Sequence, residues 1–245
     1  MEREEYNRDT NPYPSFGKKY NSERAIISLT SWTARINTVS KTLYSLLTQC
    51  PGFHIVLVLS EEEFPKMMDE LPDNLKLFAE NELIEVLWVY KNYKSFKKVL
   101  FTMDKYRTVP VISADDDCIY TCNYAQELYN KWEKNKESIF VFPHGPSKNK
   151  TFTETCGAYT IYPPKFHFNF LDKIDFITSS NVTCLDDSFY GFVANKLGIT
   201  IKNAFDNRFS KICIFHDSIN PLSELENYKQ KNKVLINKFE KIWLI

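Results

Sequence analysis

The sequence predicts an α/β fold in which a mainly parallel central sheet is covered by helices on both faces. Short apolar runs suited to buried strands alternate four times with amphipathic helix patterns over 24–114. This alternation is typical of parallel sheets whose strands are joined by right-handed helical crossovers. A chain of 245 residues can bury one sizeable core, so we expect a single domain.

The first half of the chain carries the clearest part of this pattern. The expected strands are short and apolar, and they cover 24–30, 53–60, 83–90 and 109–114. Helices are expected from Val39 until Pro51 and Gly52 end the pattern, across 62–80 with a break at Pro72, and from Phe96 to Tyr106. Such an arrangement is Rossmann-like, and ligands bind beyond the carboxyl ends of its strands.

The second half is less regular. A helix is expected around 125–132, strands at 138–145 and 155–162, and another helix from Asp186 until Gly198. The segment 1–24 is polar and contains two prolines, which predicts an N-terminal arm. The segment 221–245 is expected to form a helical tail, and its basic, apolar end would either dock on the domain or lie on an anionic membrane surface.

Composition excludes several classes of protein. Lys and Arg number 31, as do Asp and Glu, so no net charge favours nucleic acid, and no nucleic-acid-binding motif is visible. The six cysteines form no CxxC pair, which argues against zinc. We see neither a secretory signal nor an apolar stretch of about 18 residues, so we expect a cytoplasmic protein with reduced thiols.

The acidic triplet Asp115, Asp116 and Asp117 directly follows the strand expected at 109–114. In an extended segment Asp115 and Asp117 point the same way and can converge on one cation. Hard divalent ions such as Mn²⁺ or Mg²⁺ prefer these oxygen ligands, also bind diphosphates and stabilise a leaving diphosphate. A solvated acidic turn or a helix N-cap is the alternative, and the position at a ligand-binding edge favours the metal site.

A second acidic pair, Asp186 and Asp187, opens the helix expected after it. Either aspartate could cap this helix, or one of them could serve as a general base. The helix N-terminus would lower the pKa of the base, whereas nearby phosphates and Asp115 would raise it. The sequence leaves this balance open.

Other candidates come from residue type and position. Thr30 and Ser60 end strands, and Arg35, Lys97 and Lys98 could contact a diphosphate, although the lysines could equally lie on a solvated helix face. His216 follows an apolar run and is expected either to complete the metal site or to be structural.

Five segments in this order resemble bacterial polysaccharide-type glycosyltransferases of the GT-A fold, close to family two. They are ISLTSWTARI (27–36), VLSEEEFP (58–65), YKSFKKVLFTMDKYRTVPVISADDDCIY (93–120), GAYTIYPP (157–164) and CLDDSFYGFVANKLGI (184–199). The resemblance covers roughly 25–200, and the acidic triplet spaced before a DD-aromatic helix start makes it fairly specific. Cys156 departs from the glycine expected there.

The resemblance implies a metal-dependent, inverting transfer from a nucleotide sugar, a UDP-sugar above all, to a glycan or lipid-linked acceptor. Asp115 and Asp117 match the DXD residues that bind Mn²⁺ or Mg²⁺, with Asp116 beside them at the donor. Asp187, next to Asp186, matches the base, and Thr30 and Arg35 fall where the nucleotide binds. Relatives of this type build capsule, lipopolysaccharide or similar surface glycans on the cytoplasmic side of the membrane.

The expected organisation is an arm over 1–24, a catalytic domain over 25–220 and a tail over 221–245. Within the domain, 25–120 would bind the nucleotide sugar and 121–220 the acceptor. The tail offers a peripheral contact with the inner face of the membrane. Two other functions stay open, namely a nucleotidyltransferase or phosphohydrolase that uses the same aspartates, and a non-catalytic glycan-binding module.

Overall fold

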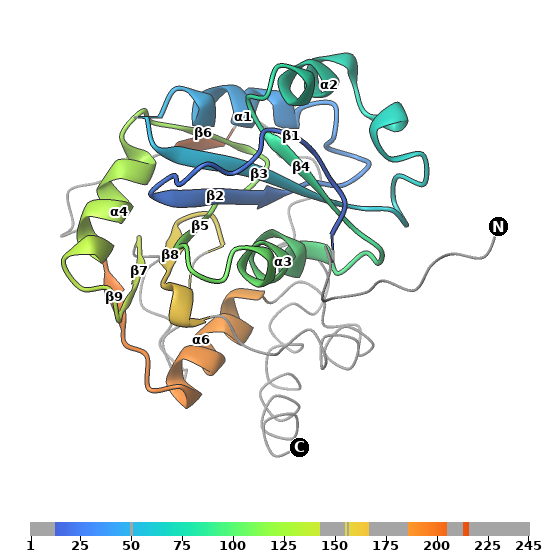
Figure 1. The fold of residues 1–245 in the computed structure, drawn as a ribbon. Coiled ribbons are helices and arrows are strands. Elements are labelled where there is room, and N and C mark those ends of the chain that lie inside the picture. The colour runs from blue at the N-terminus through green and yellow to red at the C-terminus, as the bar shows by residue number, and fades with distance from the viewer. Residues whose placement is uncertain are drawn as a thin grey trace.

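The computed structural model describes residues 13–49, 51–142, 155, 157–166, 186–204 and 213–215. Within them the chain forms the predicted α/β arrangement (Figure 1). The main sheet has eight described strands, β1 Ser15–Gly17, β2 Ala25–Thr30, β3 Phe53–Ser60, β4 Glu85–Val89, β5 Val111–Ser113, β7 Ile139–Val141, β8 Thr160–Tyr162 and β9 Ile201–Asn203. A small second sheet pairs β6 Cys118–Tyr120 with β10 Cys213–Phe215.

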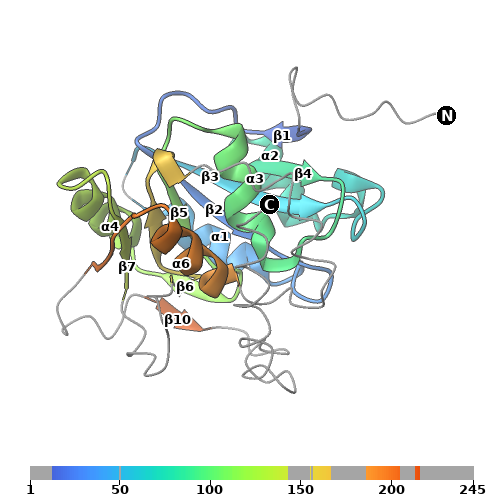
Figure 2. The same ribbon diagram turned by 90° about the horizontal axis from the view of Figure 1, so that it is seen from below.

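Helices cover both faces of the main sheet. They are α1 Val39–Leu47, α2 Asp73–Glu80, α3 Lys97–Lys105, α4 Tyr124–Glu133 and α6 Asp186–Lys196, with short 3-10 helices at Met67–Glu70, Lys94–Phe96 and Pro164–Phe166. Figure 1 shows α1 and α2 over one face and α3 and α6 over the other. Figure 2, seen from below, shows α6 next to α3. Among the described helices, none has the length and apolar character needed to cross a bilayer.

The strand order is β1-β4-β3-β2-β5-β8-β7-β9. The central strands β4, β3, β2 and β5 are parallel to one another, and β1 and β8 pair antiparallel with β4 and β5 at the two sides of this block. After β2 the chain adds β3 and β4 on one side and then crosses to add β5 on the other. The carboxyl ends of β2 and β5 therefore flank a topological switch point, where open α/β sheets bind ligands.

Two hydrophobic cores lie on opposite faces of the sheet. Successive side chains of a strand point to opposite faces, so Ile55 and Leu57 of β3 pack in the core under α1 and α2. Val56 and Val58 pack in the core under α3 and α6. Because both faces are covered, all eight residues of β3 are buried, which explains why its central part, 55–59, is a continuous apolar run.

Three local features refine the prediction. The expected arm is part of the domain from Tyr13 onward, because β1 pairs antiparallel with β4 and Tyr13 packs edge-on against Phe101. The helical pattern over 62–80 divides into the 3-10 helix and α2, which begins directly after Pro72, where a fixed φ suits a helix start. The strands expected at 138–145 and 155–162 are described only at β7 and β8, which pair antiparallel. The expected tail over 221–245 lies outside the described residues.

Candidate active site

The acidic triplet lies in the turn between β5 and β6, rather than in an extended segment. Its side chains still alternate in exposure. Asp115 and Asp117 are 36% and 17% exposed, whereas Asp116 is 8% exposed and points inward. Since the turn follows β5, the triplet stands at the topological switch point.

Asp116 joins this turn to the end of β2. Ser31 Oγ donates to Asp116 Oδ2 at 2.7 Å, and Arg35 Nη1 donates to Asp116 Oδ1 at 2.6 Å. Thr42 Oγ1 of α1 donates to the Asp116 carbonyl oxygen at 3.0 Å. Burial raises the pKa of Asp116 to about 6, although Arg35 and Ser31 act in the opposite direction. These bonds make Asp116 the member of the triplet that holds the turn in place.

The two outer carboxylates pair with different cations. Arg35 Nη1 also donates to Asp117 Oδ2 at 2.8 Å, and Lys98 Nζ of α3 donates to Asp115 Oδ1 at 2.8 Å. The backbone N–H of Asp115 donates to Tyr120 Oη at 2.8 Å. Burial, and next the charge of Asp115, raises the pKa of Asp117. The site thus contains cations of its own, which the sequence did not lead us to expect between these aspartates.

Asp186 and Asp187 begin α6 and face the same cluster. Lys98 Nζ lies 3.2 Å from Asp186 Oδ2. Thr155 Oγ1 donates to Asp187 Oδ1 at 3.4 Å, and the Gly157 N–H also donates to Asp187. Burial raises the pKa of Asp187 well above its ordinary value, and the charges of Asp186 and Asp115 raise it further. The charge of Lys98 and the Gly157 N–H act in the opposite direction, and burial in the acidic cluster outweighs them.

Both lysines of the predicted diphosphate site are buried. Lys97 and Lys98 are 1% and 4% exposed, so the solvated-face interpretation is wrong. Lys97 Nζ pairs with Glu63 Oε2 at 2.5 Å and lies 3.4 Å from Ser60 Oγ, at the end of β3. Burial lowers the pKa of Lys97, while Glu63 acts to raise it. Ser60, Glu63 and Lys97 therefore form a second polar cluster at the carboxyl edge of the sheet.

Two further predicted residues are not brought into this cluster by the described structure. Thr30 ends β2, and its Oγ1 donates to the Val58 carbonyl oxygen at 2.7 Å. His216, expected as a third metal ligand or a structural residue, lies outside the described residues.

Sequence reasoning missed several supporting residues. Glu63, Thr42, Tyr120 and Thr155 all contact the predicted site residues. The Ser-x-x-Glu spacing of Ser60 and Glu63 could have signalled that pair, because their side chains bond to each other at 2.7 Å. Thr42 and Thr155 act across distant parts of the chain, so local sequence carries no sign of them. Tyr120 lies only five residues after Asp115, but its contact depends on the turn between β5 and β6.

The described aspartates fit a divalent cation that binds together with substrate. No three His, Cys, Asp or Glu side chains in the described part of the chain are grouped to hold a metal by themselves. The cluster nevertheless sets five aspartates against Arg35 and Lys98, which leaves an excess of negative charge. Asp115 and Asp117 each have a second oxygen outside these ion pairs. One or two carboxylates plus substrate phosphates are a usual ligand set for Mg²⁺.

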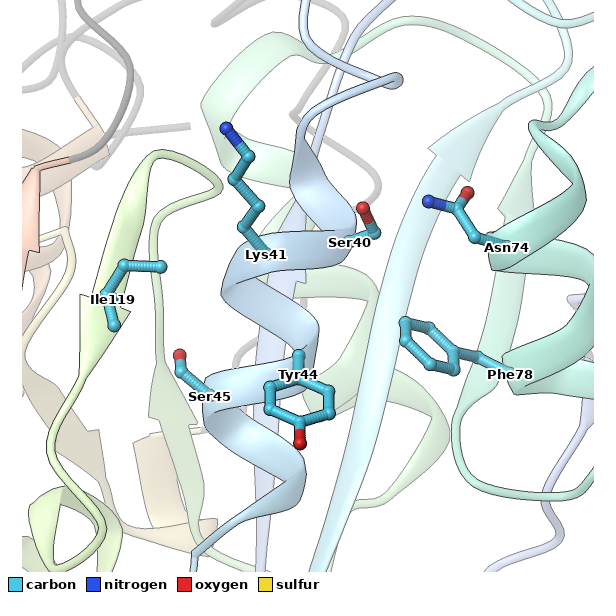
Figure 3. Close-up of a pocket in the computed structure, with 7 residues that line it drawn as sticks. All are labelled: Ser40, Lys41, Tyr44, Ser45, Asn74, Phe78 and Ile119. Atoms are coloured by element: carbon cyan, nitrogen blue, oxygen red, sulfur yellow. The ribbon is translucent and has the colours of Figure 1, made fainter.

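A pocket elsewhere in the described structure is unrelated to this chemistry. It lies between α1, α2 and β6, and Figure 3 shows Tyr44 and Lys41 on α1 with Phe78 and Asn74 on α2. Ile119 of β6 closes it on the other side of α1. None of its lining residues is a predicted site residue.

The sheet order defines an α/β protein, and its acidic turn lies at the carboxyl edge, where such sheets bind ligands. No family model matches the sequence, and no curated protein matches it. The fold is similar to that of S. aureus TarS residues 1–349 in complex with UDP-GlcNAc, with a TM-score of 0.55 and 10% identity over 86% of this chain and 65% of that chain.

Two other solved structures are more distant. A second S. aureus TarS structure has 13% identity and a TM-score of 0.47 over 73% of this chain and 35% of that one. The glycosyltransferase GlyE of Streptococcus pneumoniae TIGR4 has 11% identity and a TM-score of 0.47 over 90% and 64%. The chain thus spans from 35% to 65% of the length of the chains in these three structures. The TarS complex identifies the fold, which is the mainly parallel α/β fold that the sequence predicts.

Proposed function

We propose that the chain is a metal-dependent glycosyltransferase that transfers a sugar from a nucleotide-sugar donor, a UDP-sugar, to a glycan or lipid-linked acceptor. The observation that carries this proposal is the position of Asp115 and Asp117 at the switch point, opposite Asp187 at the start of α6. The bound nucleotide sugar of the similarly folded TarS structure supports the same class of donor. The resemblance of five segments to GT-A family two enzymes supports the transfer reaction.

Asp115 and Asp117 would hold Mn²⁺ or Mg²⁺ through the oxygens that do not pair with Lys98 and Arg35. Such an ion supplies Lewis-acid stabilisation to a departing diphosphate. Arg35 orients Asp117, and Ser31 fixes the turn through Asp116. The chain's own residues therefore preorganise the carboxylates before a donor arrives.

Asp187 would take the proton of the acceptor hydroxyl as it attacks the anomeric carbon from the side opposite the diphosphate. Its raised pKa makes it a stronger base than a solvent-exposed aspartate. Attack from that side inverts the anomeric centre. The proposed setting is the synthesis of a surface polysaccharide such as capsule or lipopolysaccharide, at the cytoplasmic side of the membrane.

A panel of UDP-sugars with Mn²⁺ tests this function, with release of UDP as the measurement. Asp117→Asn should abolish Mn²⁺-dependent release and leave the protein folded. Asp73→Asn is the matched control, because Asp73 is 98% exposed on α2. Full activity of Asp117→Asn would contradict the assignment.

Two other results would replace the proposal. Turnover of a nucleoside triphosphate or a phosphoester without any sugar acceptor would indicate a nucleotidyltransferase or phosphohydrolase. Binding of glycan without any UDP release would indicate a binding module. For an active enzyme, the anomeric configuration of the product by NMR decides inversion, and a retained configuration would remove the base role of Asp187.

A further inference from the structure

The ammonium group of Lys98 is buried between carboxylates from two distant parts of the chain. Lys98 Nζ lies 2.8 Å from Asp115 Oδ1 in the β5–β6 turn and 3.2 Å from Asp186 Oδ2 at the start of α6. A buried ammonium is costly unless it is paired and hydrogen-bonded. Lys98 therefore links the part of the site proposed to bind the donor to the part proposed to bind the acceptor.

Gly157 borders the same group. A Cβ added at Gly157 would lie 2.7 Å from Lys98 Nζ, 3.3 Å from Asp187 Oδ2 and 3.5 Å from Asp115 Oδ1. The ammonium and two carboxylates thus surround one small space beside the Gly157 backbone. Because Gly157 does not have a left-handed φ, the residue is needed there for room rather than for its backbone conformation.

We infer that Lys98 is the internal counter-cation of the acidic site and a positioning residue for Asp187. It occupies the place between Asp115 and the Asp186–Asp187 pair, so a divalent cation meets a partly neutralised cluster until a nucleotide diphosphate adds its own ligands. Its ammonium donates to Asp115 Oδ1 and forms an ion pair with Asp186 Oδ2, so both carboxylates neutralise it without a diphosphate. The role of Lys98 in positioning Asp187 rests on the proposed function, whereas its role as counter-cation does not.

A counter-cation and a diphosphate contact predict different results when the charge of Lys98 is removed. Loss of a positive charge next to Asp115 strengthens the attraction of the cluster for cations, so Lys98→Met should bind Mn²⁺ at least about tenfold more tightly without nucleotide. Loss of a diphosphate contact would leave this Mn²⁺ affinity unchanged and raise the donor KM. Lys98→Arg keeps the charge and should stay within about threefold of the wild type.

The test is titration of the metal-free protein with Mn²⁺, followed by electron paramagnetic resonance of the free ion. Lys134→Met, at an exposed position after α4, is the control for loss of a lysine charge elsewhere. Gly157→Ala serves where Lys98→Met does not fold, because its Cβ displaces the ammonium from between the carboxylates. The acidic site is then less neutralised, so this variant should also bind Mn²⁺ more tightly although it retains every charge. Lys98→Met and Gly157→Ala should each lower kcat at least about tenfold, with less than about a threefold change in donor KM, since Asp187 loses its position.

Unchanged Mn²⁺ affinity in Lys98→Met, or in Gly157→Ala where Lys98→Met does not fold, overturns the inference, as does a rise in donor KM with unchanged kcat. Failure of the proposed function looks different. A wild-type protein that turns over no UDP-sugar while Lys98→Met still binds Mn²⁺ more tightly would refute the transferase and leave the counter-cation standing. Absence of Mn²⁺ binding in the wild type, with and without UDP, overturns both.

Discussion

Arg35 donates from a single nitrogen, Nη1, to both Asp116 Oδ1 and Asp117 Oδ2, at 2.6 and 2.8 Å. The pairing joins the segment after β2 to the turn after β5, across the switch point of the sheet. Both members of the acidic turn are oriented by one guanidinium, which lies mostly buried beside them. The geometry of the proposed metal site therefore depends on a residue more than eighty positions away in the sequence.

Replacement of Arg35 should destabilise the fold. Arg35→Met leaves the Asp116 carboxylate buried without a cation, and removal of one member of a buried ion pair costs roughly 3–5 kcal/mol. We expect this loss in urea unfolding at about pH 7, and a smaller loss at about pH 5 because Asp116 then binds a proton more readily. Ser31→Ala, which removes one donor to the buried carboxylate, should cost about 1.5–3 kcal/mol. A loss below about 1 kcal/mol for Arg35→Met would show that the ion pair is dispensable.

The rate of transfer should rise with pH through the raised pKa of Asp187. The proposed base acts only when ionised, and burial beside Asp186 raises its pKa, so protonation inactivates it at a higher pH than for an ordinary aspartate. Measurement of kcat across pH should show this acidic limb in the wild type. Asp187→Asn should lower kcat by about 10²–10⁴ and lose the limb. A wild-type limb that persists in the variant would assign the titration to another group.

Glu85 should contribute stability that disappears in acid. Burial alone would raise its pKa, but bonds from His54, Lys105 and Tyr106 outweigh it and lower the pKa from 4.5 to about 2. A pKa that is lower in the folded than in the unfolded state stabilises the protein when the pH is above the unfolded-state pKa. This contribution is lost as the pH falls from about 4.5 through about 2. Such a shift corresponds to roughly 3 kcal/mol.

Urea unfolding of Glu85→Gln at several pH values measures this contribution. The variant should be less stable than the wild type by about that amount at neutral pH, and the difference should shrink towards about pH 2. Glu80→Gln, at an exposed position of α2, should change little. A difference that does not depend on pH would mean that packing, rather than ionisation, is responsible.

The N-terminal strand should be part of the cooperative fold. Gly17 has φ +93°, and an added Cβ would lie 2.4 Å from the Ile84 carbonyl oxygen. Gly17→Ala should therefore cost about 2 kcal/mol or more, from backbone strain and the close contact with backbone atoms that cannot move aside. Lys19→Ala, at an exposed position nearby, is the control. Equal stability of the two variants would place residues 13–24 outside the domain.

The sequence by itself determined the layered α/β core and the location of the acidic turn. The apolar runs at β2, β3 and β4 and the stripes of α1 and α3 are local periodicities, and burial on both faces of a parallel sheet explains them directly. The three-residue strands β1, β6 and β9 are too short to show a period and lie in no longer apolar run, so they could not be read from the sequence.

Only the tertiary structure decided how the charges are paired. The acidic triplet, the lysines and the Asp186–Asp187 pair were visible as residue types, but which carboxylate meets which cation depends on contacts between distant segments. Lys98 meets Asp115 and Asp186 because α3 and the start of α6 cover the same face of the sheet, and Arg35 meets Asp117 because β2 and β5 are neighbours. Packing also sets the burial that raises the pKa of Asp187, since desolvation depends on what surrounds a side chain rather than on what precedes it in the chain.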